Sequence, residues 1–223
     1  MKLKNKLPLI LAVLPLIFTS IALIFMPNRV PTHFGINAQP DRYGSKFECL
    51  ILPAILIAMY IIFIVIRKFL SYSSTDEEVK SKNNLKILTY IISIIFAMFN
   101  CIQILILIII FNPTYLNDKQ NILSIGICII LGLMMIFLGN VMPKTKRNSF
   151  LGMRLTFSMK SDETWYITNR SSGIGFVVSG IISIIAAFVF HSNISLFIMI
   201  IALLVCQIIA TIYSYVVIKR KGL

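Results

Sequence analysis

Residues that could perform catalysis or bind a metal are few in this sequence, and they form no recognisable set. His33 stands alone, so a metal site there would lack further ligands. The chain has no HExxH, GxSxG or phosphate-binding glycine motif. A single histidine in a loop is usually structural. We therefore expect no enzymatic activity, no metal and no cofactor.

The four cysteines also lack a reactive arrangement. Cys49, Cys101, Cys128 and Cys206 lie in or at the edge of apolar runs, and none of them has CxxC spacing. Thiols in such surroundings behave as small hydrophobic side chains. We predict neither a disulfide nor a nucleophile among them.

The elements that must position any site are membrane spans. The 223 residues are 58% hydrophobic with a mean hydropathy of +0.90, which is more apolar surface than a soluble domain can bury. Runs of about 20 apolar residues match a hydrocarbon core about 30 Å thick. The predicted fold class is therefore an all-α polytopic membrane protein with about six transmembrane helices. The runs cover residues 7–26, 47–66, 87–111, 121–142, 174–190 and 194–218.

The distribution of basic residues predicts how these spans are oriented. If the N-terminus lies inside, the inner loops and tails hold 17 of the 21 Lys and Arg residues. Cytoplasmic loops collect such residues in membrane proteins, so the net charge of +13 indicates no direct binding of nucleic acid. Both termini are expected to be cytoplasmic. The basic residues left outside are Arg29, Arg42, Lys46 and Lys119.

Two polar segments separate the apolar runs. The outer loop, residues 27–46, is expected to face out, and its three prolines exclude a regular helix. The inner segment, residues 143–172, is expected to face the cytoplasm and contains a basic cluster and the only Trp. Ser161 is placed to cap a helix that runs into the fifth span. Phe157 and Trp165 are expected to anchor the segment at the membrane interface.

The spans themselves carry no ionisable residue at their centres, which argues against an ion-coupled transporter. Asn100 and Gln103 share one face of the third span, and Gln207 lies in the sixth. These amides could line a ligand path or form hydrogen bonds between helices, and we favour hydrogen bonds.

Small residues recur at a spacing of four in the fifth span, at Gly175, Ser179, Ser183 and Ala187. Such a ridge allows the backbone of a neighbouring helix to approach closely. We favour packing within one chain over a homodimer seam.

Both polar segments resemble known bacterial sequences. The outer loop with Met26, MPNRVPTHFGINAQPDRYGSK, resembles the loop of a widespread bacterial domain of unknown function. The matching residues are Pro27, Pro31, His33, Phe34, Pro40, Asp41, Arg42, Gly44 and Lys46. The inner segment resembles the signature of the SdpI family. Its matching residues are Gly139, Asn140, Pro143, Lys144, Asn148, Phe150, Gly152, Arg154, Ser161, Glu163, Trp165, Thr168 and Arg170. The sequence departs from the family pattern at 155–159 and at Asn169, where the family commonly has His.

The resemblance implies a bacterial plasma-membrane protein that gives immunity to a secreted antimicrobial peptide of the SDP type. It also implies signalling, in which the loaded protein draws a small cytoplasmic repressor to the membrane. The expected partners are the lipid bilayer, the toxin peptide outside and the repressor inside. Candidate residues of the outer face are His33, Phe34, Asp41, Arg42 and Lys46. Candidates of the inner face are Asn140, Lys144, Asn148, Gly152, Arg154 and Trp165.

Two alternatives remain open from the sequence: a transporter or channel for a small solute or peptide, and an envelope-stress signalling protein without a toxin ligand. The expected domains are residues 1–70, with two spans and the outer loop, and 71–120, with a linker and the third span. The third domain, residues 121–223, resembles the SdpI family and holds spans four to six with the inner segment.

Overall fold

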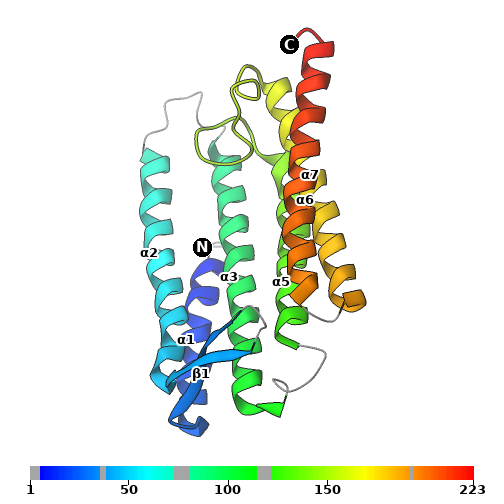
Figure 1. The fold of residues 1–223 in the computed structure, drawn as a ribbon. Helices are drawn as coiled ribbons and strands as arrows, with labels where there is room; N and C mark the ends of the chain where they lie inside the picture. Colours follow the sequence, from blue (N-terminus) through cyan, green and yellow to red (C-terminus); the bar gives the residue numbers. More distant parts are fainter. Residues whose placement is uncertain (1–5, 36–38, 73–80, 115–121, 191–192) are drawn as a thin grey trace.

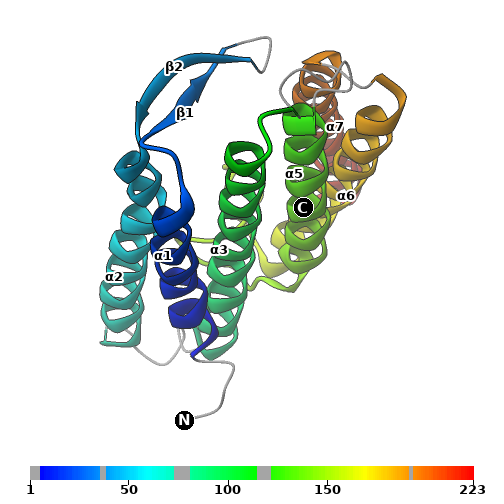
Figure 2. The same cartoon turned by 90° about the horizontal axis from the view of Figure 1, so that it is seen from below.

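Six long helices form one bundle in the computed structural model, which describes residues 6–35, 39–72, 81–114, 122–190 and 193–223 (Figures 1 and 2). Each is long and apolar enough to cross a membrane, which confirms the predicted polytopic fold. The helices are α1 (Leu7–Phe25), α2 (Ile51–Tyr72), α3 (Ser81–Phe111), α5 (Ile122–Val141), α6 (Asp162–Phe190) and α7 (Asn193–Arg220).

The outer loop contains a β-hairpin that the sequence analysis did not predict. Strands β1 (Arg29–Phe34) and β2 (Pro40–Ser45) pair antiparallel, and a 3-10 turn, η2 (Lys46–Leu50), leads into α2. Prolines are tolerated because each strand of a two-stranded sheet is an edge strand. Val30 is fully buried with Met26, Leu107 and Ile110, so the hairpin is packed onto the ends of α1 and α3.

The inner segment lies at the opposite end of the bundle from the hairpin (Figure 1). It begins with a short 3-10 turn, η4 (Met142–Lys144), and continues as an irregular chain to Ser161. The backbone amide of Thr164 donates to Ser161 Oγ at 3.1 Å, which confirms the predicted helix cap. Helix α6 then runs without a break from the polar residues of the segment into the apolar span.

The helices pack as two groups of three, and α3 and α5 join the groups. Helices α1, α2 and α3 contact one another, while α6 lies against both α5 and α7 (Figure 2). The connection between the groups is therefore a single helix pair, with further contacts at its two ends that are described below.

The backbones of α5 and α6 approach very closely. A Cβ atom added to Gly180 would lie 2.5 Å from the carbonyl oxygen of Gly132, and one added to Gly173 would lie 2.6 Å from that of Gly139. Gly132 and Gly139 are seven residues apart on α5, and Gly173 and Gly180 are seven residues apart on α6. The two close contacts therefore lie on one line along the helix pair. This glycine line was missed by the sequence analysis, and it fixes α6, and hence the end of the inner segment, on α5.

The predicted ridge of small residues in α6 also packs within the chain. Ser183 Oγ donates to the carbonyl oxygen of Cys128 on α5 at 2.9 Å, and Ser179 and Ala187 are fully buried. Gly175 instead faces α7, where an added Cβ would lie 3.1 Å from the carbonyl oxygen of Cys206. The small residues of the ridge therefore pack against two neighbouring helices, α5 and α7.

Buried amides join the helices, as predicted. Gln103 Nε2 donates to Thr19 Oγ1 at 3.0 Å and to the carbonyl oxygen of Cys49 at 3.1 Å. Asn100 Nδ2 donates to the carbonyl oxygen of Leu11 at 2.8 Å. In the second group, Gln207 exchanges hydrogen bonds with Ser172. These contacts fasten α3 to α1 and η2, and α6 to α7.

Candidate functional site

The centre of the inner segment is a buried contact between Trp165, Asn169 and the chain around Gly152. Trp165 is only 2% exposed, and its indole Nε1 donates to the carbonyl oxygen of Thr145 at 2.9 Å. Asn169 is fully buried; its Oδ1 accepts from the backbone amide of Met153 at 2.7 Å, and its Nδ2 donates to the carbonyl oxygen of Trp165 at 3.0 Å. Trp165 and Asn169 of α6 thus hold the irregular chain at two points, Thr145 and Met153.

Gly152 allows the chain to pass over this pair. Its φ angle is +100°, a region that other residues rarely adopt. A Cβ atom here would collide with Asn169 Oδ1 and lie 2.8 Å from the Trp165 ring. The turn predicted beside Arg154 is therefore present, and its position is determined by close approach as well as by backbone conformation.

Asn148 builds a second turn just before Gly152. Its Oδ1 accepts from the backbone amides of Phe150 and Leu151, each at 2.7 Å, and its Nδ2 donates to the carbonyl oxygen of Lys146 at 2.6 Å. A side chain that replaces backbone partners in this way stabilises a compact loop. Asn148 consequently acts on the shape of the segment.

Hydroxyl groups close the segment onto the start of α6. Ser158 is fully buried and its Oγ accepts from the amide of Leu155 at 2.8 Å. The carbonyl oxygen of Ser158 accepts from Thr164 Oγ1 at 3.1 Å. Phe157 contacts the ring of Tyr215 on α7 edge to face, with 5.5 Å between centroids. The stretch 155–159, where the sequence departs from the family pattern, is therefore well packed.

Two asparagines of α3 connect the inner segment to the first helix group. Asn84 Nδ2 donates to the carbonyl oxygen of Lys146 at 3.1 Å, and Asn84 Oδ1 accepts from the amide of Lys146 at 3.0 Å. Asn83 Nδ2 donates to the carbonyl oxygen of Lys144 at 3.0 Å. The sequence analysis missed both residues, which are about 60 positions away from their partners.

The candidate residues of the inner face divide into two kinds. Asn140, Lys144 and Arg154 have exposed side chains that a partner can reach. The side chain of Trp165 is only 2% exposed, because its ring is enclosed by the segment itself. Trp165 is therefore a positioning residue.

The outer hairpin carries exposed charged pairs. His33 Nδ1 lies 2.5 Å from Asp41 Oδ1, with both side chains more than half exposed. Arg42 Nη2 donates to Glu48 Oε2 at 3.1 Å, and Arg42 Nε donates to Thr32 Oγ1 at 3.2 Å. The hairpin thus presents two exposed polar pairs, His33 with Asp41 and Arg42 with Thr32, that connect its two strands.

Two other candidates of the outer face attach the hairpin to the bundle. Lys46 Nζ donates to the carbonyl oxygen of Leu23 at 3.0 Å, near the C-terminal end of α1, where a cation suits the helix dipole. Phe34 is partly buried against Ile109 of α3 and Leu123 of α5. The hairpin therefore contacts both helix groups at its end of the bundle.

These arrangements support contact with a partner at either end of the bundle. Among the described residues no group of three or more His, Cys, Asp or Glu side chains is placed to hold a metal ion. Hydrogen bonds within each polar segment support its shape, and its exposed side chains include charged and amide groups as well as aromatic ones such as Tyr43 and Phe150.

Comparison with known proteins finds a family match for one segment near each end of the chain. Residues 144–214 match the SdpI/YfhL protein family, and residues 10–57 match a domain of unknown function, DUF1648. The chain is 25% identical over 216 residues to the Immunity protein SdpI of Bacillus subtilis (strain 168), covering 95% of this chain and 94% of that protein. It is also 49% identical over 43 residues to an uncharacterized protein of Archaeoglobus fulgidus, which is 19% of this chain and 24% of that one. No solved structure matches. The chain therefore combines a segment that matches the SdpI/YfhL family and an N-terminal DUF1648 domain, in a fold with six helices that are able to span a membrane.

Proposed function

We propose that this protein gives its host immunity to a secreted antimicrobial peptide of the SDP type and acts in the bacterial plasma membrane. The observation that carries the proposal is the similarity to the Immunity protein SdpI, which extends over nearly the whole length of both chains. The similarity includes both helix groups, the hairpin and the inner segment, so it covers the complete arrangement rather than one motif.

The hairpin faces outward in this proposal, and the inner segment and both termini face the cytoplasm. The excess of basic residues on the side of the inner segment supports this orientation. The arriving peptide would meet His33, Asp41 and Arg42 on the hairpin. Exposed side chains of both signs there suit a peptide with its own charged groups.

The inner segment docks a small cytoplasmic repressor. Its surface is basic, and Arg154 and Lys144 are exposed on a frame held by buried hydrogen bonds. A rigid frame reduces the ordering that a partner must impose on binding. Arg154→Ala is expected to abolish co-purification of the repressor, whereas Arg170→Ala, also exposed, leaves it unchanged.

Survival of a toxin-sensitive bacterium tests the immunity proposal. The full chain is produced in that bacterium, its membrane level is measured, and the cells are challenged with an SDP-type peptide. The expected result is growth at peptide concentrations that stop cells carrying an empty vector. If survival is unchanged at normal membrane levels of the protein, the immunity proposal fails.

A further inference from the structure

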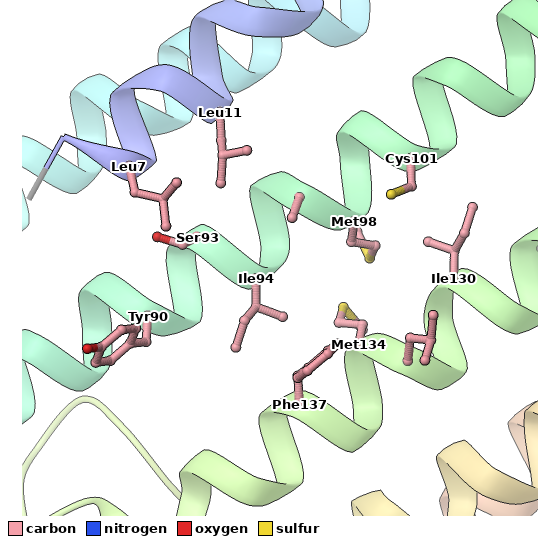
Figure 3. Close-up of a pocket in the computed structure, with 12 residues that line it drawn as sticks. Leu7, Leu11, Tyr90, Ser93, Ile94, Met98, Cys101, Ile130, Met134 and Phe137 are labelled. Carbon is pink, nitrogen blue, oxygen red and sulfur yellow. The ribbon is translucent and has the colours of Figure 1, made fainter. Parts of the chain in front are cut away.

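An apolar groove opens between the two helix groups, on the side of α3 and α5 that also faces α1. Its volume is about 470 Å³, within the roughly 300–1,000 Å³ typical of small-molecule sites. Met98 of α3 and Met134 of α5 lie on opposite walls, and Leu7 and Leu11 of α1 form a third side (Figure 3). Apart from the Ser93 and Tyr90 hydroxyls and the Cys101 thiol, its lining side chains are hydrocarbon or thioether groups.

The groove is bounded at both of its ends along the helix axes. Toward the hairpin, α3 and α5 are in tight contact, since a Cβ added to Gly126 would lie 2.6 Å from a methyl carbon of Leu105. Toward the inner segment, the hydrogen bonds of Asn83 and Asn84 rejoin α3 to the chain that follows α5. The groove lies between these two contacts. The groove is thus a defined space rather than part of the general surface of the bundle.

Positive charge surrounds the end of the groove nearest the inner segment. Lys86 is exposed and stands one turn before Tyr90, on the same face of α3. On the other wall, Asn140 stands one turn after Phe137 on α5, and Lys144 follows in η4; both are exposed. The amide of Asn83 joins these two walls, so the two lysines stand on either side of one gap.

The two acidic residues that the structure describes at this end are engaged elsewhere. Glu163 Oε1 lies 2.7 Å from Lys221 Nζ, and Asp162 Oδ1 lies 3.2 Å from Arg147 Nε. The rim of the groove therefore combines positive charge with hydrogen-bond donors. The apolar wall begins one turn deeper, at Tyr90 and Phe137.

We propose that this groove binds one anionic phospholipid, with an acyl chain between α3 and α5 and its phosphate at Lys86 and Lys144. Basic pockets between transmembrane helices on the cytoplasmic side suit anionic head groups, and each lysine near the surface contributes about 1 kcal/mol, or about fivefold in affinity. The apolar walls suit hydrocarbon, and tyrosine is a residue that favours the level where a head group meets its chains.

Such a lipid would join the two helix groups. The α1–α3 group carries the hairpin and the α5–α7 group carries the inner segment, and direct helix contact between them is limited to α3 with α5 and weaker neighbours. A chain bound between Met98 and Met134 fills the space that side chains leave there. The bound lipid thus acts as a structural component beside the inner segment, independently of any toxin.

Lipid retention by the purified full chain tests the proposal. The protein is purified in detergent, incubated with phosphatidylglycerol or phosphatidylcholine, and examined by native mass spectrometry. We expect one phosphatidylglycerol per chain, bound in preference to phosphatidylcholine. Replacing both lysines, Lys86→Gln with Lys144→Gln, weakens binding about 25-fold. Its matched control, Lys160→Gln with Lys219→Gln, removes two exposed charges elsewhere and leaves binding within twofold.

A second pair of variants tests the acyl chain. Ala97→Phe fills the groove and is expected to prevent retention, whereas Val205→Phe on the exposed face of α7 has no effect. If Ala97→Phe fails to fold, the lysine double variant still tests the proposal. Both lysines are exposed, so their replacement is not expected to disturb folding. Equal retention of phosphatidylcholine, unchanged binding in the lysine double variant, or occupation of the groove by a second copy of the chain would each overturn the proposal.

Discussion

The outer hairpin and the inner segment both join two membrane helices, but they are stabilised in different ways. In the inner segment the decisive polar contacts are buried: Trp165 and Asn169 are nearly or fully enclosed, and each satisfies a backbone group. In the hairpin the charged pairs are exposed, such as His33 with Asp41. A buried polar group without a partner is costly, whereas an exposed ion pair contributes little to stability. Changes in the two segments should therefore have different consequences.

The largest effect is expected for Gly152→Ala. The added Cβ meets Asn169 Oδ1 and the Trp165 ring, and the backbone would be held at a φ of +100°. Together, strain and overpacking are expected to destabilise the protein by about 2–6 kcal/mol. The measurement is thermal unfolding of the purified protein in detergent. Gly222→Ala is the control, since it also has positive φ but no atom within 4 Å of an added Cβ. Equal effects of the two substitutions would contradict the buried contact.

Asn169→Leu should have the next largest effect. It leaves the partly buried amide of Met153 without an acceptor, which is expected to cost about 1–3 kcal/mol. The neighbouring Arg170→Leu, at an exposed position, is expected to be close to neutral in the same unfolding experiment. A neutral Asn169→Leu would show that the segment can rearrange without this contact.

Asn84→Ala is expected to produce a smaller, local effect. It removes two hydrogen bonds to the backbone of Lys146 at a partly exposed position, so the loss of stability is about 1 kcal/mol. Hydrogen exchange should increase at the amide of Lys146, because its acceptor is gone. In Asn83→Ala this amide keeps its partner, and its protection should persist. Unchanged exchange in Asn84→Ala would argue against the connection between the helix groups.

The smallest effect on stability is expected for the hairpin double variant His33→Ala with Asp41→Ala. Both side chains are exposed, so the change in unfolding free energy should be within about 1 kcal/mol. Resistance to the peptide should nevertheless be lost, because these groups belong to the proposed binding surface. If resistance is retained, His33 and Asp41 do not belong to the peptide-binding surface. If the protein loses much stability, the proposed difference between the hairpin and the inner segment is wrong.

The membrane scaffold could be predicted from the sequence because its signal is local. Apolar runs of sufficient length predict spans without knowledge of their neighbours, and α1 ends at Phe25, one residue from the expected position. The Ser161 cap likewise depends on residues within one turn, and the structure confirms it.

Contacts between distant residues could not be predicted in this way. Asn83 and Asn84 reach backbone groups about 60 positions away, and no spacing rule connects them. The burial of Trp165 against Gly152 and Asn169 likewise depends on contacts with a separate stretch of chain, which the local sequence does not indicate. The hairpin was missed because Pro31 and Pro40 argue against strands, except at the edges of a sheet.

The growth response of a sensitive bacterium to an SDP-type peptide tests the central claim most directly. Three strains are compared at matched membrane levels: one with the wild-type chain, one with the hairpin double variant and one with an empty vector. The account predicts that the wild-type chain raises the inhibitory concentration of the peptide and that the hairpin variant resembles the vector. An identical inhibitory concentration in all three strains would contradict it.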